Sequence, residues 1–203
     1  DVESNIAFLI YGNDGNDTLD FSAVTKGTYI ADSQYDALDG NDTVALPTDA
    51  AAATAAGFDL SKAFHGGDGD DSIVGSKVND ALYGDDGNDT IRGSLGNDSL
   101  YGGTGTDTVD YSAASGGVTI NLATGAVTGA DGTDSISGFE TIIGSTFADT
   151  ITNAASGRSD VRGGDLRDPL DVDVGERHAG VEGDRRQDRC LCRGVEALDV
   201  GRR

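Results

Sequence analysis

The chain lacks the residues that build a conventional hydrophobic core. Its 203 residues include no Trp and no Met, and only 6% are aromatic. Glycine, in contrast, is abundant, with 31 residues. A chain so poor in large apolar side chains cannot bury enough surface to offset its backbone entropy in the usual globular way.

Positive charge is also scarce. Residues 1–153 carry 25 acidic side chains against 4 basic ones, and the whole chain has a net charge of −22. A polyanion cannot bind nucleic acid by neutralising phosphates, so we exclude nucleic acid as a partner. No N-terminal signal peptide is visible, and no apolar run is long enough to span a membrane.

Recognisable catalytic motifs are missing as well. The chain has no G-x-S-x-G, H-E-x-x-H, Walker or G-x-G-x-x-G pattern. His65 fits a turn or surface histidine, His178 suggests no role, and Cys190 and Cys192 fit unpaired thiols. We therefore predict that this chain is not an enzyme and that any catalytic domain lies upstream of it.

The chain does contain a nine-residue repeat. Five copies follow one another without insertion over residues 66–110: GGDGDDSIV, GSKVNDALY, GDDGNDTIR, GSLGNDSLY and GGTGTDTVD. Each opens with Gly, has Asp at its sixth position and an aliphatic residue at its eighth, a pattern that predicts one turn and one short strand. Two copies complete one coil of a solenoid, so turns on the same edge recur every eighteen residues.

Stacked acidic turns need a cation. At a strand spacing of about 4.8 Å, the sixth-position aspartates would otherwise repel one another strongly. Ca²⁺ accepts six to eight oxygen ligands, carbonyls included, and suits this supply better than the rigidly octahedral Mg²⁺. Zn²⁺ and copper are disfavoured because the array has no Cys and its nearest His lies outside the turns.

The copy GGDGDDSIV resembles the G-G-x-G-x-D-x-U-x nonapeptide of the RTX (repeats-in-toxin, haemolysin-type calcium-binding) proteins. The resemblance implies an all-β fold, a parallel β-roll in which each Ca²⁺ lies between turns n and n+2. It implies three ions within residues 66–110, between Asp71 and Asp89, between Asp89 and Asp107, and, on the other edge, between Asp80 and Asp98. The candidate metal residues of the array are Gly66, Gly67, Asp68, Gly69, Asp71, Asp80, Gly84, Asp85, Gly87, Asp89, Gly93, Gly96, Asp98, Gly102, Gly103, Gly105 and Asp107.

One turn departs from the repeat. The copy at Gly75 has Lys77 at its third position and Val78 where the fourth-position glycine belongs. A cation beside the site and a β-branched residue in a tight turn both weaken metal binding. We expect the site between Asp80 and Asp98 to be the weakest of the three.

Partial repeats with a short helix occupy residues 1–65. Asp17 and Asp42 hold the sixth position of two such repeats and are further calcium candidates. Neither has a neighbour eighteen residues away in register, so complete sites are not expected there. The segment PTDAAAATAAG, residues 47–57, predicts the helix because Pro and Asp precede an alanine run and Gly follows it.

The repeat loosens after residue 110. Residues 111–153 predict a strand-rich continuation of the roll with irregular loops, a strand over 118–122, and Asp134 as a calcium candidate, with Asp149 a weaker one. Residues 154–203 contain ten Arg but no Asn, Thr, Ile, Phe, Tyr or Lys. They are either a shifted reading frame or a genuine Arg/Asp-rich tail, and in both cases we expect poor order.

The resemblance also implies a biological setting. RTX proteins are secreted by Gram-negative bacteria through type I secretion machinery. Without bound calcium so acidic a chain should be largely disordered, so it should fold only outside the cell, where calcium is available. We therefore expect a secreted, extracellular β-roll module that folds on Ca²⁺ and aids export of an attached domain. The alternatives are a C-terminal fragment of a secreted enzyme or toxin (protease, lipase, epimerase or haemolysin) and an adhesin or surface-layer repeat. The oligomeric state stays open.

Overall fold

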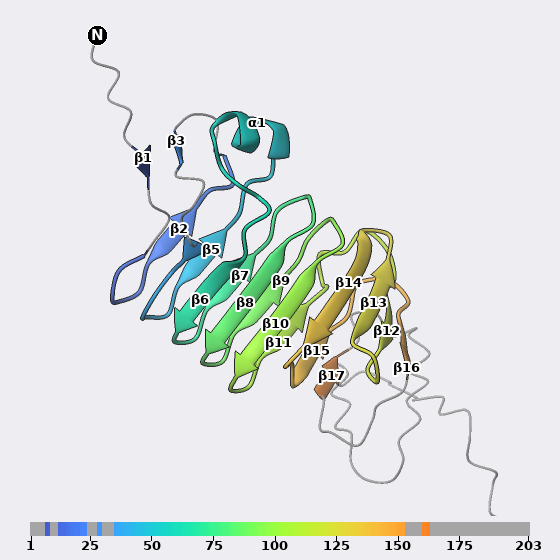
Figure 1. Ribbon diagram of the computed structural model, residues 1–203. Helices are drawn as coiled ribbons and strands as arrows, with labels where there is room; N and C mark the ends of the chain where they lie inside the picture. The colour runs from blue at the N-terminus through green and yellow to red at the C-terminus, as the bar shows by residue number, and fades with distance from the viewer. Residues whose placement is uncertain (1–6, 9–11, 24–27, 30–34, 153–159, 163–203) are drawn as a thin grey trace, which may run out of the picture.

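The computed structural model describes residues 7–8, 12–23, 28–29, 35–152 and 160–162. In these residues the chain winds into two facing sheets that advance along one axis, with the single helix of the described part at one end (Figure 1). The elements are β1 (Ala7–Phe8), β2 (Thr18–Asp20), β3 (Thr28–Tyr29), β4 (Tyr35–Asp36), β5 (Thr43–Ala45), α1 (Ala50–Ala55), β6 (Phe64–Asp68), β7 (Ser72–Val74), β8 (Ala81–Asp86), β9 (Thr90–Arg92), β10 (Ser99–Thr104), β11 (Thr108–Asp110), β12 (Thr119–Asn121), β13 (Ala126–Gly129), β14 (Gly132–Ser137), β15 (Thr141–Ile143), β16 (Thr150–Thr152) and β17 (Asp160–Arg162).

The nine-residue repeat alternates between the two sheets. One sheet has the order β17-β15-β11-β9-β7-β5-β2 and the other β16-β12-β13-β14-β10-β8-β6-β4, with a separate pair β1-β3. Strands within the array pair in parallel and in the register of the repeat, so that Ile73 faces Ile91 and Ile91 faces Val109. The sheets are therefore those of a β-roll, the all-β fold class that the sequence predicts.

Each sheet contributes one row of aliphatic side chains to the core. The eighth-position residues Ile73, Leu82, Ile91, Leu100 and Val109 are all 0% exposed. Their seventh- and ninth-position neighbours point outward because successive side chains of a strand face opposite sides. One fully buried aliphatic side chain for each nine-residue copy is a thin core, so backbone hydrogen bonds and the turns must contribute much of the stability.

A wider cap covers the end of the roll that contains α1. The predicted helix is present, with Asp49 as N-cap, whose carboxylate accepts from the Ala52 N–H at 3.0 Å. Beside it the ring of Phe58 packs against those of Tyr35 and Phe21, at centroid distances of 4.8 and 5.5 Å. No helix in the described segments is long and apolar enough to cross a membrane.

The continuation beyond the array contains an antiparallel hairpin. β13 pairs antiparallel with both β12 and β14, whereas β14 returns to pair in parallel with β10. The strand expected over residues 118–122 is β12, and the loop that follows it turns at Gly125, whose φ is 68°. The roll therefore continues past the repeats, but its strand order there no longer follows the sequence order.

We predict that Ile91→Ala destabilises the protein in the presence of Ca²⁺ by about 2–4 kcal/mol, because it leaves a cavity in a file only one side chain wide. Thr90→Ala, on the exposed side of the same strand, should change stability by less than about 0.5 kcal/mol. Denaturant unfolding of both variants checks this. Equal losses would show that the eighth position is not the core.

Candidate metal sites

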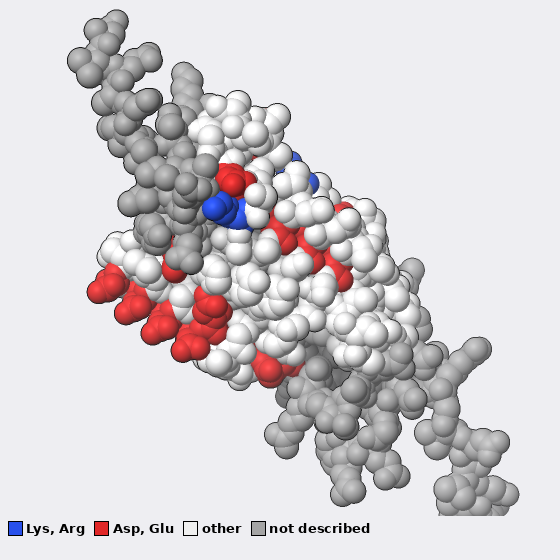
Figure 2. Space-filling view, in the orientation of Figure 1, with Lys and Arg blue, Asp and Glu red and all other residues white. Residues whose placement is uncertain are grey.

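The turns of the roll form two edges. The first edge contains the turn that leads into β2 and the turns from β4 to β5, from β6 to β7, from β8 to β9 and from β10 to β11; the second contains those from β7 to β8 and from β9 to β10. Figure 2 shows acidic side chains in a row along the first edge. The exposed acidic residues of the first-edge turns are Asp14, Asp39, Asp68, Asp70 and Asp86.

Beneath that exposed row, a ladder of acidic residues runs along the first edge, buried at Asp42, Asp71, Asp89 and Asp107 and half-buried at its two ends. Each backbone N–H donates to a carboxylate oxygen of the next turn. The pairs, donor first, are Asp17 to Asp42 (2.7 Å), Asp42 to Asp71 (2.7 Å), Asp71 to Asp89 (2.8 Å), Asp89 to Asp107 (2.9 Å) and Asp107 to Glu140 (2.9 Å).

The ladder also includes Asp17 and Asp42. Neither has a neighbour eighteen residues away, as the sequence indicates, yet both have a partner in the ladder. The reason is that the insertions before β4 and β6 leave by the second edge, so they lengthen the coil without shifting the first-edge turns. The spacing between ladder members becomes 25 and 29 residues instead of 18. Glu140, which closes the ladder, lies outside any recognisable repeat, and sequence reasoning missed it.

The second edge carries a shorter ladder of the same kind. The Asp80 N–H donates to Asp98 Oδ1 at 2.9 Å, and the Asp98 N–H donates to Asp134 Oδ1 at 3.0 Å. Asp134 lies 36 residues from Asp98 because the β12–β13 hairpin intervenes in sequence. The structure thus brings the candidate Asp134 next to the array. Asp149, in contrast, accepts from the Val118 N–H at 2.8 Å, beyond the hairpin.

A second set of side chains, at the fifth position, also joins the turns. The N–H of each following turn donates back to this side chain, opposite in direction to the aspartate ladder. Examples are Asn88 to Asp70 (2.8 Å), Thr106 to Asn88 (2.9 Å) and Asn97 to Asn79 (2.9 Å). Sequence reasoning missed this role, although Asn or Asp at the fifth position of most copies was a visible signal.

The aspartate ladders leave buried oxygens without partners. Asp71, Asp89 and Asp107 are at most 3% exposed, and in each of them one oxygen, Oδ2, has no hydrogen-bond partner. The same holds for Asp42 and Asp98. Native proteins rarely leave such atoms unsatisfied, and a buried carboxylate without compensation is costly. The arrangement therefore calls for a cation beside each unpartnered oxygen.

The opening glycines provide the space for that cation. A β carbon on Gly84 would overlap Asp89 Oδ2 and the carbonyl oxygen of Gly102. The same overlap occurs at Gly66, with Asp71 and Gly84, and at Gly102, with Asp107 and Gly138. Each absent side chain thus leaves a cradle in which a carboxylate oxygen and a carbonyl oxygen of the next turn come together, and oxygen donors of this kind fit Ca²⁺.

The cradles do not suit metals that need clustered side chains. Among the described residues, no group of three or more His, Cys, Asp and Glu side chains could hold a metal ion. Backbone carbonyls must then supply most of the ligands. Hard cations that accept carbonyl oxygens fit this donor set, and Zn²⁺ does not.

Burial raises the pKa of six of the ladder carboxylates when no cation is present. It raises the pKa of Asp71 and of Asp98 to about 7, and that of Asp80 and of Asp89 to about 6, with the neighbouring carboxylates adding to the shift at Asp71, Asp89 and Asp98. Burial raises the pKa of Asp107 and Asp134 in the same way. Protons and metal ions should therefore compete for the same oxygens.

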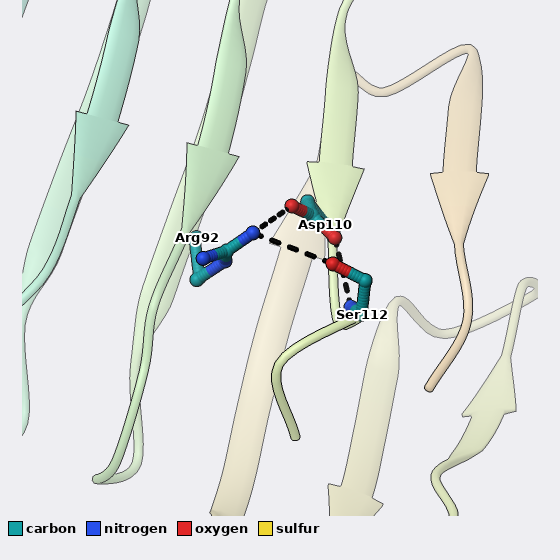
Figure 3. Close-up of polar contacts among 3 residues, drawn as sticks. All are labelled: Arg92, Asp110 and Ser112. Carbon is teal, nitrogen blue, oxygen red and sulfur yellow. Dashed lines mark hydrogen bonds and ion pairs between the residues drawn. The ribbon is translucent and has the colours of Figure 1, made fainter. Parts of the chain in front are cut away.

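Asp110 shows what a buried carboxylate of this roll needs to remain charged. Burial alone would raise its pKa, but hydrogen bonds from Ser112 and the ion pair with Arg92 lower it (Figure 3). The Arg92 guanidinium also reaches Ser112 Oγ at 3.4 Å, and the Ser112 N–H donates to Asp110 Oδ1 at 2.8 Å. No described Lys or Arg side chain pairs with the ladder aspartates, so another cation has to do so.

The remaining sequence candidates have other surroundings. Asp68 is exposed at the tip of its turn, and the Asp85 carboxylate lies 2.8 Å from His65 Nδ1. Gly67, Gly69, Gly87, Gly96, Gly103 and Gly105 have φ between 106° and 140°. The carboxylates of Asp68 and Asp85 therefore lie outside the two aspartate ladders. Pro169, His178, Cys190, Cys192 and the tail beyond residue 162 lie outside the described residues.

We predict that the calcium-free protein is stabilised by acid. Groups whose folded pKa is raised to 6–7 contribute stability that is present below the unfolded value of about 4 and is lost as the pH rises through the folded pKa. Calcium-stripped protein should therefore gain β signal in circular dichroism as the pH falls from about 8 to about 5.

A matched pair of variants separates this effect from general charge repulsion. Asp89→Asn should reduce the pH dependence, whereas Asp86→Asn, exposed in the same turn, should leave most of it. Stability that rises with pH over this range would contradict the burial of the ladder.

The comparisons with known proteins agree with the geometry. The family model of the RTX calcium-binding nonapeptide repeat matches residues 9–23, 64–82 and 83–113, in 4 copies. A search of curated proteins found no match. Such repeats form a structural calcium-binding module and not a catalytic one, and the match confirms the resemblance drawn from the sequence. Residues 9–23, 64–82 and 83–113 are therefore RTX-type calcium-binding repeats, around which this chain folds as a β-roll.

Proposed function

We propose that this chain is a module that folds when Ca²⁺ fills the first edge of the roll. The observation that carries the proposal is the row of buried Oδ2 atoms on Asp71, Asp89 and Asp107, each without a partner and each beside a glycine cradle. A bound divalent ion would neutralise two adjacent carboxylates at once and remove the cost of their burial. Binding free energy would then appear as folding free energy.

The proposed first-edge ions occupy three spaces. Two lie between Asp71 and Asp89 and between Asp89 and Asp107, as the repeat spacing predicts. The third lies between Asp107 and Glu140, because the cradle at Gly102 has the same arrangement toward Gly138. Asp42 has an unpartnered oxygen too, but Ala37 stands where the other turns have glycine, so we place no ion there.

The second edge has fewer aspartates with an unpartnered oxygen. Of Asp80, Asp98 and Asp134, only Asp98 has an oxygen without a partner, since Tyr111 donates to Asp134 Oδ2 at 3.0 Å. We assign Asp98 and Asp134 as the second-edge candidate pair, bridging the array and the continuation.

We further propose that folding is coupled to export. A chain with 25 acidic and 4 basic side chains in residues 1–153 repels itself where free calcium is scarce and is compensated where calcium is near the millimolar range of extracellular modules. On this proposal the protein is secreted, with type I secretion machinery as a partner, and the roll stabilises a domain attached to it. Attachment to a secreted enzyme, toxin or adhesin is compatible with the same site.

The test is a titration of Ca²⁺ into calcium-stripped protein, followed by far-UV circular dichroism with Mg²⁺ in parallel. We expect a coil-to-β transition with Ca²⁺ and little change with Mg²⁺, because Mg²⁺ keeps its waters and demands an octahedral site. A full β spectrum in chelator would overturn the proposal.

Asp89 and Asp107 should be the most sensitive single positions, since each faces two of the proposed ions. Asp89→Asn is expected to shift the calcium midpoint at least about tenfold upward. Asp86→Asn removes one charge from the exposed row of the same turn and should shift the midpoint less than about twofold. Equal shifts would mean that diffuse charge, and not the ladder, drives the transition.

A further inference from the structure

The turns of the roll fall into two conformational classes. In one, the residue at the second position is left-handed: Leu38, Gly67, Asp85, Ser94 and Gly103, with φ between 74° and 121°. In the other, represented by Asn13 and Ser76, the second residue is not left-handed. Three members of the first class are not glycine, so this conformation is kept at a steric cost.

The class of a turn matches the state of its aspartate. Every turn with a left-handed second residue leaves Oδ2 of its aspartate unpartnered, namely in Asp42, Asp71, Asp89, Asp98 and Asp107. In the other class, the second-position N–H donates to that oxygen, from Asn13 to Asp17 at 2.7 Å and from Ser76 to Asp80 at 2.6 Å. In these seven turns the conformation of the second residue therefore decides whether the carboxylate is satisfied by its own turn. The turn of Asp134 is outside this set, because Tyr111 donates to its Oδ2.

The side chain of Ser76 supplies a second hydrogen bond to the carboxylate of Asp80. Its hydroxyl donates to Asp80 Oδ1 at 2.9 Å and accepts from the Val78 N–H at 3.2 Å, and the residue is 0% exposed. Both oxygens of Asp80 thus have protein donors, which explains why Asp80, buried as it is, has no orphaned atom. Val78 stands where neighbouring turns have a left-handed glycine, and its β-branched side chain holds the turn out of that conformation.

The serine hydroxyl of this construction occurs once more. In the turn from Gly144 to Asp149, the Ser145 hydroxyl donates to Asp149 Oδ1 at 2.6 Å and accepts from the Phe147 N–H at 3.0 Å, and Ser145 is 0% exposed. The two turns, GSKVND and GSTFAD, share the pattern G-S-x-Φ-x-D, where Φ is apolar. One begins the second-edge ladder, and the other leads into β16, at the end of its sheet.

We propose that the residue at the second position decides whether a turn binds a metal ion. On this proposal the turn GSKVND forms without metal, with Ser76 in the place of an ion at Asp80. The proposal rests on calcium binding by the first edge. It moves the cause of the weak second-edge site from the charge of Lys77 to the conformation of the turn. The space between Asp80 and Asp98 then holds no calcium in the native chain.

The test counts bound ions per chain by isothermal titration calorimetry and native mass spectrometry on the full chain. Ser76→Gly/Val78→Gly restores glycine at both special positions and should bind about one ion more than the wild type. Lys77→Asp changes only the charge and should add none. Ser94→Gly, at the same position of a turn already left-handed, should also leave the count unchanged.

A further variant covers the case in which the double variant does not fold. Ser76→Ala removes the hydroxyl but keeps the turn, so the ion count should stay the same while the thermal midpoint in Ca²⁺ falls by about 2–6 °C. Loss of an ion in Ser76→Ala would make Ser76 part of a metal site and overturn the proposal.

The remaining outcomes are equally decisive. A double variant that folds with the wild-type count, or a Lys77→Asp variant that gains an ion, would contradict conformational selection while leaving calcium binding intact. A wild type that binds no calcium at all would instead remove the proposed function on which this inference rests.

Discussion

In each turn of this roll a carboxylate is buried within one strand spacing of the next, and the structure depends on how that charge is compensated. The backbone N–H of the preceding turn supplies one hydrogen bond to each ladder member. One hydrogen bond is not enough, because a second oxygen of the same group stays buried and unpartnered on the first edge. Burial of a charge is tolerated only where a counter-charge or several donors meet it.

The protein compensates buried carboxylates in three ways. At Asp110 the counter-charge is Arg92; at Asp80 the donors come from Ser76; along the first edge only a bound cation remains. These alternatives make the stability of the roll uneven along its length, because in a solenoid each turn contacts only its neighbours. On the proposed function, stretches with internal donors form without metal, whereas the stretch from Asp71 to Asp107 needs it.

The repeat makes much of the fold predictable from the sequence. The position of the buried Ile or Leu, the alternation between two sheets and the pairing of aspartates eighteen residues apart all follow from one nine-residue period.

Other features could not be predicted from the repeat. Of the cap around Phe58, the sequence predicts only the helix over Ala50–Ala55. Glu140 and Asp134 could not be placed in the ladders from sequence, because their register depends on how the β12–β13 hairpin folds back. The partnership of Asp17 with Asp42 was hidden for a similar reason, since an insertion on one edge leaves the other edge in register. Ser76 escaped notice because a serine beside glycine looks neutral until its turn conformation is known.

The most direct measurement is a crystal structure of the protein grown in calcium, with anomalous scattering to identify the ions. We expect ions along the first edge, in contact with Oδ2 of Asp71, Asp89 and Asp107 and with carbonyl oxygens of the adjoining turns. Density that shows these oxygens bound only to water or to protons, with no ion between the turns of a folded roll, would contradict this expectation.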